Sequence, residues 1–235
     1  MKLQIDNFDG HGPRDYTSAI DVSRSPKILR RLNKPDELQL SLLADTPDFI
    51  VPSNGARVTL GRANGGDVFT GYLTQAPAFE YLGWCERGPV YRYNLVAQGD
   101  EVLLDRKQIP NCPPFVDRSA GDALRQLTED LLPGIFDTSA VQQVDTLAHY
   151  APDPQKKWSE HAAKIALLAR AAYRAINGAL SFAPVGASAH ALNEADTSFS
   201  PEGLKLNPAD GVLNDVTVFG LIEPQAYVKD YFIRR

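Results

Sequence analysis

The segment from Asp153 to Pro184 constrains the fold most, because it predicts a short amphipathic helix that leads directly into a two-residue hairpin. Asp153-Pro154 supplies an N-cap residue followed by proline at the first helical position, and Ser159 offers a second cap one turn later. Apolar residues then recur at helical spacing on one face, namely Trp158, Ala162, Ile165, Ala166 and Ala169, with Leu168 at the edge of the stripe. The pattern predicts a helix that begins here and ends near Ala171.

The dipeptide Asn177-Gly178 follows this helix and lies between two short apolar runs, Tyr173–Ile176 and Ala179–Phe182. Asparagine and glycine both accept a positive φ, which a type I′ hairpin turn requires at its two central positions. We therefore predict a hairpin after the helix. The alternative is one longer helix from Pro154 with Gly178 just beyond its end, because glycine also terminates helices.

The composition is that of a folded globular protein with many turns. The 235 residues are 43% hydrophobic and 23% charged, which are ordinary values and permit one large domain or two small ones. The 17 glycines and 17 prolines are more than a helical protein tolerates. We therefore expect a mainly β protein with many short strands.

The charge and the cysteines exclude several classes of protein. The formal net charge is -5, from 24 basic and 29 acidic residues, which argues against a dedicated nucleic-acid-binding domain. No apolar stretch is long enough to span a bilayer and no signal peptide precedes the first strand, so we expect neither membrane insertion nor Sec export. Cys85 and Cys112 have no cysteine or histidine at metal-binding spacing, so we expect two reduced, structural thiols.

The first hundred residues predict a large β-sheet. In Glu37–Ala44, alternate leucines face one side and polar residues the other, as in a strand with one buried face. Gly65-Gly66 predicts a tight reversal and Gly71 a kink in the strand that follows. Seven strands are expected, at Tyr16–Val22, Lys27–Leu32, Glu37–Ala44, Ala56–Arg62, Asp67–Thr74, Phe79–Cys85 and Val90–Gln98.

A second, smaller unit is expected after Asp100. Prolines at 110, 113 and 114 form a connector, and Ser119 with Asp122 forms a capping box at the start of a helix that Pro133-Gly134 ends. The apolar stripe of this helix is Ala123, Leu124, Leu127, Leu131 and Leu132. A strand-like segment, Ala140–Val144, leads to the helix and hairpin described above.

Strands return near the end of the sequence, at Gly203–Leu206, Asp215–Leu221 and Tyr227–Ile233. These strands are too few to form a stable sheet alone, so we expect them to join the first sheet. The predicted fold is mainly β with an α+β insertion. A small β-barrel of residues 1–105 plus 205–235 is split by an inserted helix-helix-hairpin domain, residues 106–204.

No catalytic or cofactor site is recognisable. His11, His149 and His190 are scattered, and His161 is expected on the polar flank of its helix, in a surface ion pair with Glu160, so no metal site is predicted. No GxSxG nucleophile elbow or phosphate loop occurs. Three pairs of neighbouring carboxylates occur, namely Asp100 and Glu101, Glu129 and Asp130, and Glu194 and Asp196. We expect these side chains on opposite faces of a strand or in solvent rather than as a catalytic pair. We predict a protein without enzymatic activity or cofactor, with a glycosidase as the weakest alternative.

Two surface features remain as candidate interfaces. One is a basic run, which docks an acidic partner, blocks unwanted pairing at a strand edge, or forms a joint between subunits: Arg24, Lys27, Arg30, Arg31 and Lys34. The other is an aromatic cluster, which we expect in the core, with a sugar-stacking platform as the alternative: Phe79, Tyr81, Trp84, Tyr91 and Tyr93.

Several segments together resemble the hub proteins of phage tail tips and baseplates. The run Tyr91–Lys107 is similar to a strand of that family that ends in an aspartate, two leucines and a basic cluster. Val22–Leu29 and Leu38–Leu42 resemble the family's first hairpin.

The downstream pattern resembles the same family. Ser119–Leu132, Tyr150–Pro154 and Trp158–Phe182 are similar to its capped helix, short link, second capped helix and hairpin. The resemblance implies small β-barrel domains with an inserted α+β domain, assembled as trimers around the tail tube and without catalysis. Family members usually continue beyond a point equivalent to Tyr231–Arg235, which leaves a downstream spike-binding or lytic domain open.

The function expected from this resemblance is a structural subunit of a phage or prophage tail tip or baseplate hub ring, which connects the tail tube to a spike or fibres. Its partners would be copies of itself, a tail tube or distal tail protein, and a spike or fibre protein. DNA would pass through the lumen only as a polymer in transit, and the negative charge would oppose its adsorption. The protein would be made in the host bacterial cytoplasm and reside at the virion tail tip. The alternative function is a carbohydrate-binding module of a tail fibre or surface protein.

Overall fold

The computed structural model describes residues 1–63 and 65–187, and these residues form one compact unit. The three strands expected between residues 203 and 233 lie outside the described residues. The barrel that they would complete, and the boundary at residues 204 and 205, therefore remain predictions.

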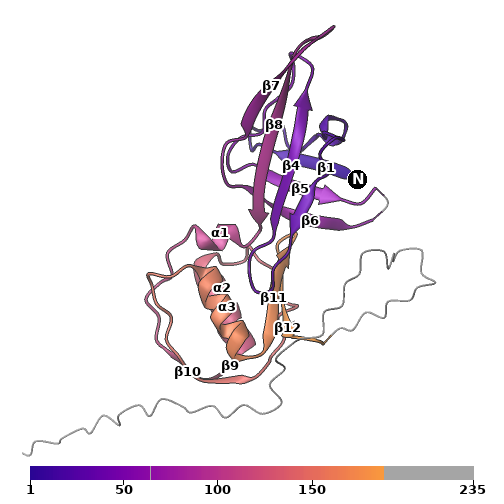
Figure 1. The fold of residues 1–235 in the computed structure, drawn as a ribbon. Coiled ribbons are helices and arrows are strands. Elements are labelled where there is room, and N and C mark those ends of the chain that lie inside the picture. Colours follow the sequence, from indigo (N-terminus) through magenta and orange to yellow (C-terminus); the bar gives the residue numbers. More distant parts are fainter. Residues whose placement is uncertain (64, 188–235) are drawn as a thin grey trace, which may run out of the picture. The chain divides into compact units, whose positions relative to one another are not determined.

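The first half of the unit is one antiparallel sheet (Figure 1). The strands follow the order β2-β1-β5-β6-β8-β4-β3, and β7 pairs with β8 outside this path. They comprise β1 (Lys2–Asp6), β2 (Arg14–Asp15), β3 (Lys27–Leu29), β4 (Glu37–Ala44), β5 (Arg57–Gly61), β6 (Asp67–Leu73), β7 (Ala78–Cys85) and β8 (Gly88–Gly99). Among the described residues the path does not close, because β2 and β3 are its two ends.

Six of the seven predicted strands are confirmed, and one is wrong. Tyr16–Val22 contains the 3-10 helix η1 (Thr17–Ala19) instead of a strand. The reason is its attachment to β1, which the sequence did not predict: the Tyr16 amide donates to the Leu3 carbonyl at 2.9 Å, and the Leu3 amide donates to Thr17 Oγ1 at 2.9 Å. The Thr17 hydroxyl thus accepts the Leu3 amide in place of a backbone carbonyl, and the pairing with β1 does not continue beyond this point.

The β5–β6 hairpin is confirmed, but the irregularity is an extra residue, Val68, in β6 rather than a kink at Gly71, because Leu60 pairs with Phe69 and Gly61 with Asp67. The register shifts between Leu60 and Gly61. Gly71 instead permits close approach of β6 and β8, because a Cβ at this position would collide with the carbonyl group of Gln98.

The second half of the unit contains three helices and two small sheets (Figure 1). The helices α2 and α3 pack together, and α3 packs against β11. The sheets pair β9 with β10 and β11 with β12, both antiparallel. The elements are α1 (Val102–Asp105), β9 (Phe115–Ser119), α2 (Ala120–Leu131), β10 (Thr146–Tyr150), α3 (Trp158–Leu168), β11 (Ala171–Ile176) and β12 (Ala179–Pro184).

Helix α2 is confirmed, whereas its capping box is wrong. Ser119 occupies the N-cap position, yet its hydroxyl is buried without a hydrogen-bond partner among the described residues. Asp122 pairs with Arg125 at 2.6 Å. The strand expected at Ala140–Val144 is also wrong, because only an isolated bridge joins Val141 to β12.

The helix-to-hairpin segment is confirmed in type and corrected at its start. Helix α3 begins at Trp158, because Asp153 forms a turn in which its carboxylate accepts the Gln155 amide at 3.0 Å. The hairpin turn has φ values of 51° at Asn177 and 73° at Gly178, as a type I′ turn requires. The alternative of one long helix through this region is therefore wrong.

Two separate hydrophobic cores result. The sheet buries side chains from Leu3 to Ala97, and the second core draws on residues from Leu104 to Phe182. Trp158 and Phe182 are fully buried in the second core. The second half therefore has a core of its own rather than an extension of the first.

Candidate functional site

The part of the chain that the structure describes contains four candidate sites. Within residues 1–63 and 65–187, no group of three or more acidic, histidine or cysteine side chains could hold a metal ion. No helix in this part of the chain is both long and apolar enough to cross a membrane. The four candidates are a surface hollow, the basic run, the aromatic cluster, and the joint between the two cores.

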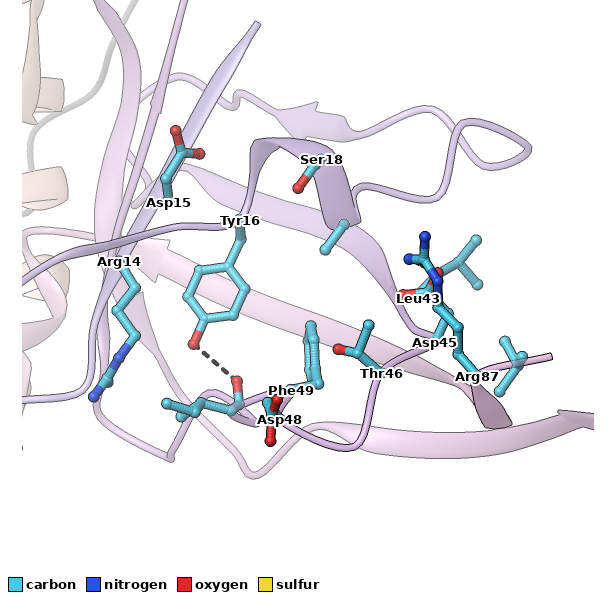
Figure 2. A pocket seen from close by; sticks show the side chains of 13 residues that line it. Arg14, Asp15, Tyr16, Ser18, Leu43, Asp45, Thr46, Asp48, Phe49 and Arg87 are labelled. Carbon is cyan, nitrogen blue, oxygen red and sulfur yellow. Dashed lines mark hydrogen bonds and ion pairs between the residues drawn. The ribbon is translucent and has the colours of Figure 1, made fainter. Parts of the chain in front are cut away.

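The surface hollow lies beside η1 and the loop after β4, with a volume of about 590 Å³ (Figure 2). Its charged groups are largely paired: Arg14 lies 2.6 Å from Asp9 and Arg87 lies 3.6 Å from Asp45. The hydrogen bond from Arg14 lowers the pKa of Asp9. Figure 2 also shows the Tyr16 hydroxyl, which donates to the Ile50 carbonyl at 2.8 Å. These pairs tie the loops together and provide no nucleophile with an adjacent base.

The basic run follows the edge strand β3 and the turn after it, the location expected for charges that block edge pairing. Arg30 is engaged within the molecule, since its guanidinium lies 3.3 Å from Asp36 and donates to the Val68 carbonyl at 2.5 Å. Arg24 lies 3.9 Å from Glu80, at the limit of an ion pair.

The rest of the basic run is exposed and free. Lys27, Arg31 and Lys34 form no ion pair with another described residue. The structure therefore divides the predicted interface into two side chains that stabilise the sheet and three that present positive charge to solvent.

Three of the five rings in the aromatic cluster are on the surface, so the predicted core location is wrong for them, whereas Tyr91 and Tyr93 are half-buried. Phe79, Tyr81 and Trp84 are 69%, 57% and 75% exposed. All three lie on β7, which has β8 as its only partner strand among the described residues. No helix or second sheet within the described residues covers this hairpin, whereas α3 packs on β11 in the second core.

A β-bulge gathers these aromatic side chains on one face. Phe79 pairs with Tyr93 and Tyr81 with Tyr91, and the register then shifts before Trp84 pairs with Pro89. Directly paired residues share a face, so the extra residue returns Trp84 to the face of the other rings. Without the bulge, strand alternation would place Trp84 on the opposite face.

The aromatic face continues the core of the sheet outward. The rings of Tyr81 and Tyr91 lie 5.6 Å apart, and those of Phe79 and Tyr93 lie 6.1 Å apart. Tyr93 in turn stacks on Phe49 at 5.7 Å and packs against the buried residues of the sheet. The result is a row of rings that is half-buried at one end and exposed at the other.

The opposite face of the same hairpin carries an ionic cluster. Arg92 lies 2.7 Å from Asp21 and 3.1 Å from Glu80. Hydrogen bonds from Ser23 and Arg92 lower the pKa of Asp21. The two faces of the hairpin therefore differ in chemistry, one aromatic and one ionic.

Asp100 and Glu101 are buried at the end of β8, which corrects the expectation that they point to opposite faces of a strand. Both carboxylates accept hydrogen bonds from the β11–β12 hairpin: Asp100 accepts the Gly178 amide at 2.9 Å and Glu101 accepts the Ala175 amide at 2.7 Å. Burial raises the pKa of Glu101 to about 7. The only sequence signal for this role is two acids between a strand and the apolar run of α1.

His161 is also buried, so the expected surface ion pair with Glu160 is wrong. Its Nε2 lies 2.9 Å from the Asp153 carbonyl, which can only accept, so Nε2 carries the proton. Nδ1 then accepts from the Tyr150 hydroxyl at 2.5 Å. Burial raises the pKa of Tyr150 to about 12. This histidine fastens the start of α3 and has no open coordination position.

Comparisons with known proteins place this fold. No family model matches the chain, and no curated protein matches its sequence. The 43 kDa tail protein of prophage MuSo2 from Shewanella oneidensis aligns over 78% of this chain and 55% of its own, with a TM-score of 0.54 and 12% identity.

Two further solved structures agree. The prophage tail protein gp18 from Listeria monocytogenes aligns over 78% of this chain and 51% of its own, with a TM-score of 0.54 and 9% identity. A tail protein from Neisseria meningitidis aligns over 77% of this chain and 49% of its own, with a TM-score of 0.50 and 12% identity. The chain thus spans about half the length of these proteins. The chain has the fold of phage tail proteins, and the resemblance predicted from its sequence is confirmed at the level of the fold.

Proposed function

We propose that the protein is a structural, non-enzymatic subunit of a phage or prophage tail tip or baseplate hub ring, which joins the tail tube to a spike or fibres. The observation that carries this proposal is the shared fold with a prophage tail protein over 78% of the chain.

The proposed assembly is a homotrimer that contacts a tail tube or distal tail protein on one side and a spike or fibre protein on the other. Residues 205–235 would complete the first sheet into a barrel around the insertion of residues 106–204. The edge strand β3 and its free charges, Lys27, Arg31 and Lys34, would lie at a joint between subunits. A closed ring satisfies such edges in a way that a monomer does not.

The oligomeric state tests this proposal. Mass photometry of the full chain should show a trimer, or a hexamer if two rings associate, and a monomer at all concentrations would contradict the proposal. The charge reversal Lys34→Glu should shift the assembly toward monomer, because it places a negative charge at the proposed joint. Lys107→Glu, an exposed lysine outside the basic run, is the matched control and should leave the assembly unchanged.

The proposed lumen would let DNA pass without adsorption. The formal charge of -5 opposes contact with phosphates over about 10 Å at ordinary ionic strength. A gel-shift assay of the assembled protein at low salt should show no retardation of DNA, and tight binding would contradict this part of the proposal.

A second candidate function is a carbohydrate-binding module, favoured by the exposed rings of Phe79, Tyr81 and Trp84. Aromatic faces stack on the apolar faces of sugars, and these three side chains share one face of the hairpin. A glycan array should then give binding that Trp84→Ala abolishes and Phe8→Ala retains, because Phe8 is an exposed aromatic residue away from this hairpin. No binding to any glycan would remove this candidate.

A further inference from the structure

The β11–β12 hairpin is held against the first sheet by side chains in place of a partner strand. On one side β11 pairs with β12. On the other side, three alternate amides of β11 and its turn donate to side chains from the first half of the chain. The three contacts are Tyr173 N to Asn33 Oδ1 (3.2 Å), Ala175 N to Glu101 Oε1 (2.7 Å) and Asn177 N to Thr70 Oγ1 (2.6 Å).

The central contact depends on a carboxyl group that is almost completely buried. Glu101 is 1% exposed, and its Oε2 has no hydrogen-bond partner among the described residues. Asp100 beside it accepts the Thr70 hydroxyl at 2.7 Å and the Gly178 amide at 2.9 Å through Oδ2, while its Oδ1 has no partner there. An unpartnered, buried carboxylate oxygen is costly, whereas a neutral carboxyl group avoids most of that cost.

The charges around Glu101 disfavour its ionised form. Asp36 and Asp100 act on it with negative charge, and Tyr173 on β11 faces it as a neutral hydroxyl whose pKa is raised by burial and by Glu101 itself. The nearby cations are engaged elsewhere: Arg30 and Arg174 each lie 3.3 Å from Asp36, and Arg57 donates to the Asn177 side chain at 3.0 Å. No described lysine or arginine forms an ion pair with Glu101.

We propose that Glu101 is a pH-sensitive latch, whose neutral form holds the edge of β11 closed and whose ionised form releases it. In the closed state the proton resides on Oε2, and Oε1 remains free to accept the Ala175 amide. Loss of that proton leaves a negative charge beside Asp36 and Asp100 in a site that is shielded from solvent. Opening lets water solvate the carboxylate, so the open state is favoured as the pH rises.

The expected size of the effect follows from linkage. Burial raises the pKa of Glu101 to about 7 in the closed state, against its ordinary value of 4.5 when it is hydrated. The closed state then binds the proton more tightly, and the opening equilibrium should rise about tenfold between pH 6 and pH 8. This inference concerns the joint alone and holds whether or not the protein forms a tail ring.

Amide hydrogen exchange of the full chain, resolved by residue and corrected for intrinsic exchange, tests the latch. The amides of Ala175, Asn177 and Gly178 should lose about tenfold in protection from pH 6 to pH 8. Amides in the β4–β8 ladder, such as Leu40 and Leu95, should keep their protection. Unchanged protection at Ala175, or an equal loss in the β4–β8 ladder, would overturn the proposal.

The variant Glu101→Gln isolates the responsible group. Glutamine keeps the acceptor oxygen for the Ala175 amide but cannot ionise, so the slope with pH should disappear. Glu86→Gln, at an exposed glutamate of the other hairpin, should keep the wild-type slope. A slope that persists in Glu101→Gln would assign it to another group and overturn the proposal. If Glu101→Gln does not fold, the pH titration of the Glu101 carboxyl carbon chemical shift in the wild-type protein tests the proposal instead. A midpoint near pH 7 is expected, and a midpoint near pH 4.5 would overturn the proposal.

Discussion

The molecule contains two long hairpins that are similar in local design and opposite in environment. In β7–β8 every residue from Ala78 to Leu82 is exposed. In β11–β12, Leu180 and Phe182 are fully buried, and the outer edge of β11 is bonded to side chains. Both hairpins alternate apolar and polar residues, as in Phe79–Tyr81 and Leu180–Phe182, so alternation alone does not separate them.

The difference arises from what packs on each hairpin. Helix α3 lies on β11, and the acids at the end of β8 bond its far edge. β7 receives neither a helix nor a second partner strand among the described residues. An aromatic face that no part of the described unit covers is typical of a surface that meets another molecule. The packed hairpin β11–β12 should therefore contribute to stability, whereas the exposed rings of β7–β8 should contribute little to it.

The largest expected effect contrasts one phenylalanine from each hairpin. Phe182→Ala should lower the free energy of unfolding by about 3–5 kcal/mol, because it removes a fully buried ring and leaves a cavity in the second core. Phe79→Ala should change it by less than about 0.5 kcal/mol, because that ring is already exposed to water. Urea unfolding followed by circular dichroism measures both. Comparable losses in the two variants would show that β7 is covered in solution.

The next effect is a pH dependence confined to the β11–β12 side. The native pKa of Glu101 is raised to about 7, so the native state binds more protons than the unfolded state between pH 4.5 and pH 7. Stability therefore falls as the pH rises, by about 2–3 kcal/mol from pH 5 to pH 8. A carboxyl group with a lowered native pKa, such as that of Asp21, makes the stability rise with pH instead, and it does so only at more acidic pH.

Chemical denaturation at a series of pH values measures this slope. Glu101→Gln should flatten the profile between pH 5 and pH 8, with its greatest gain in stability at the alkaline end. A wild-type profile that rises over this range would contradict the assignment of a neutral Glu101 to the native state.

A smaller effect separates two threonines that pair directly across β5 and β6. Thr70→Val should cost about 1–3 kcal/mol, because the Asn177 amide loses its acceptor and Asp100 loses a donor. Thr59→Val should be close to neutral, because the Thr59 hydroxyl has no side-chain partner among the described residues. The substitutions have the same shape and β propensity, so a difference in unfolding free energy reports the hairpin joint. Equal values would show that this joint contributes little.

The sequence predicted the elements of this fold better than their surroundings. Asn177-Gly178 dictates a hairpin because both residues accept a positive φ, and the structure confirms it. The leucine alternation of β4 likewise predicts its buried face, and its bounds agree with the prediction. Such features are local, because a few neighbouring residues determine them.

The missed features depend on contacts between distant segments. The roles of Asp100 and Glu101 depend on amides more than 70 positions away, which no spacing rule anticipates. The burial of His161 depends on its contact with Tyr150. Phe79 is exposed because no element of the described unit covers it. Trp84 shares a face with Tyr81 only because of a bulge. Gly83 is the one residue in the sequence that indicates this bulge.

The smallest expected effect on stability is at Trp84, and it gives the comparison its sharpest form. Trp84→Ala should change the free energy of unfolding by less than about 0.5 kcal/mol, because the side chain is 75% exposed. If the aromatic face meets another molecule, the same substitution should weaken that contact by about 2 kcal/mol or more, as buried interface tryptophans do. Mass photometry reports the contact with another copy, and a glycan array the contact with a sugar. A variant that unfolds more readily yet retains both properties would reverse the assignment, because Trp84 would then stabilise the hairpin rather than recognise a partner.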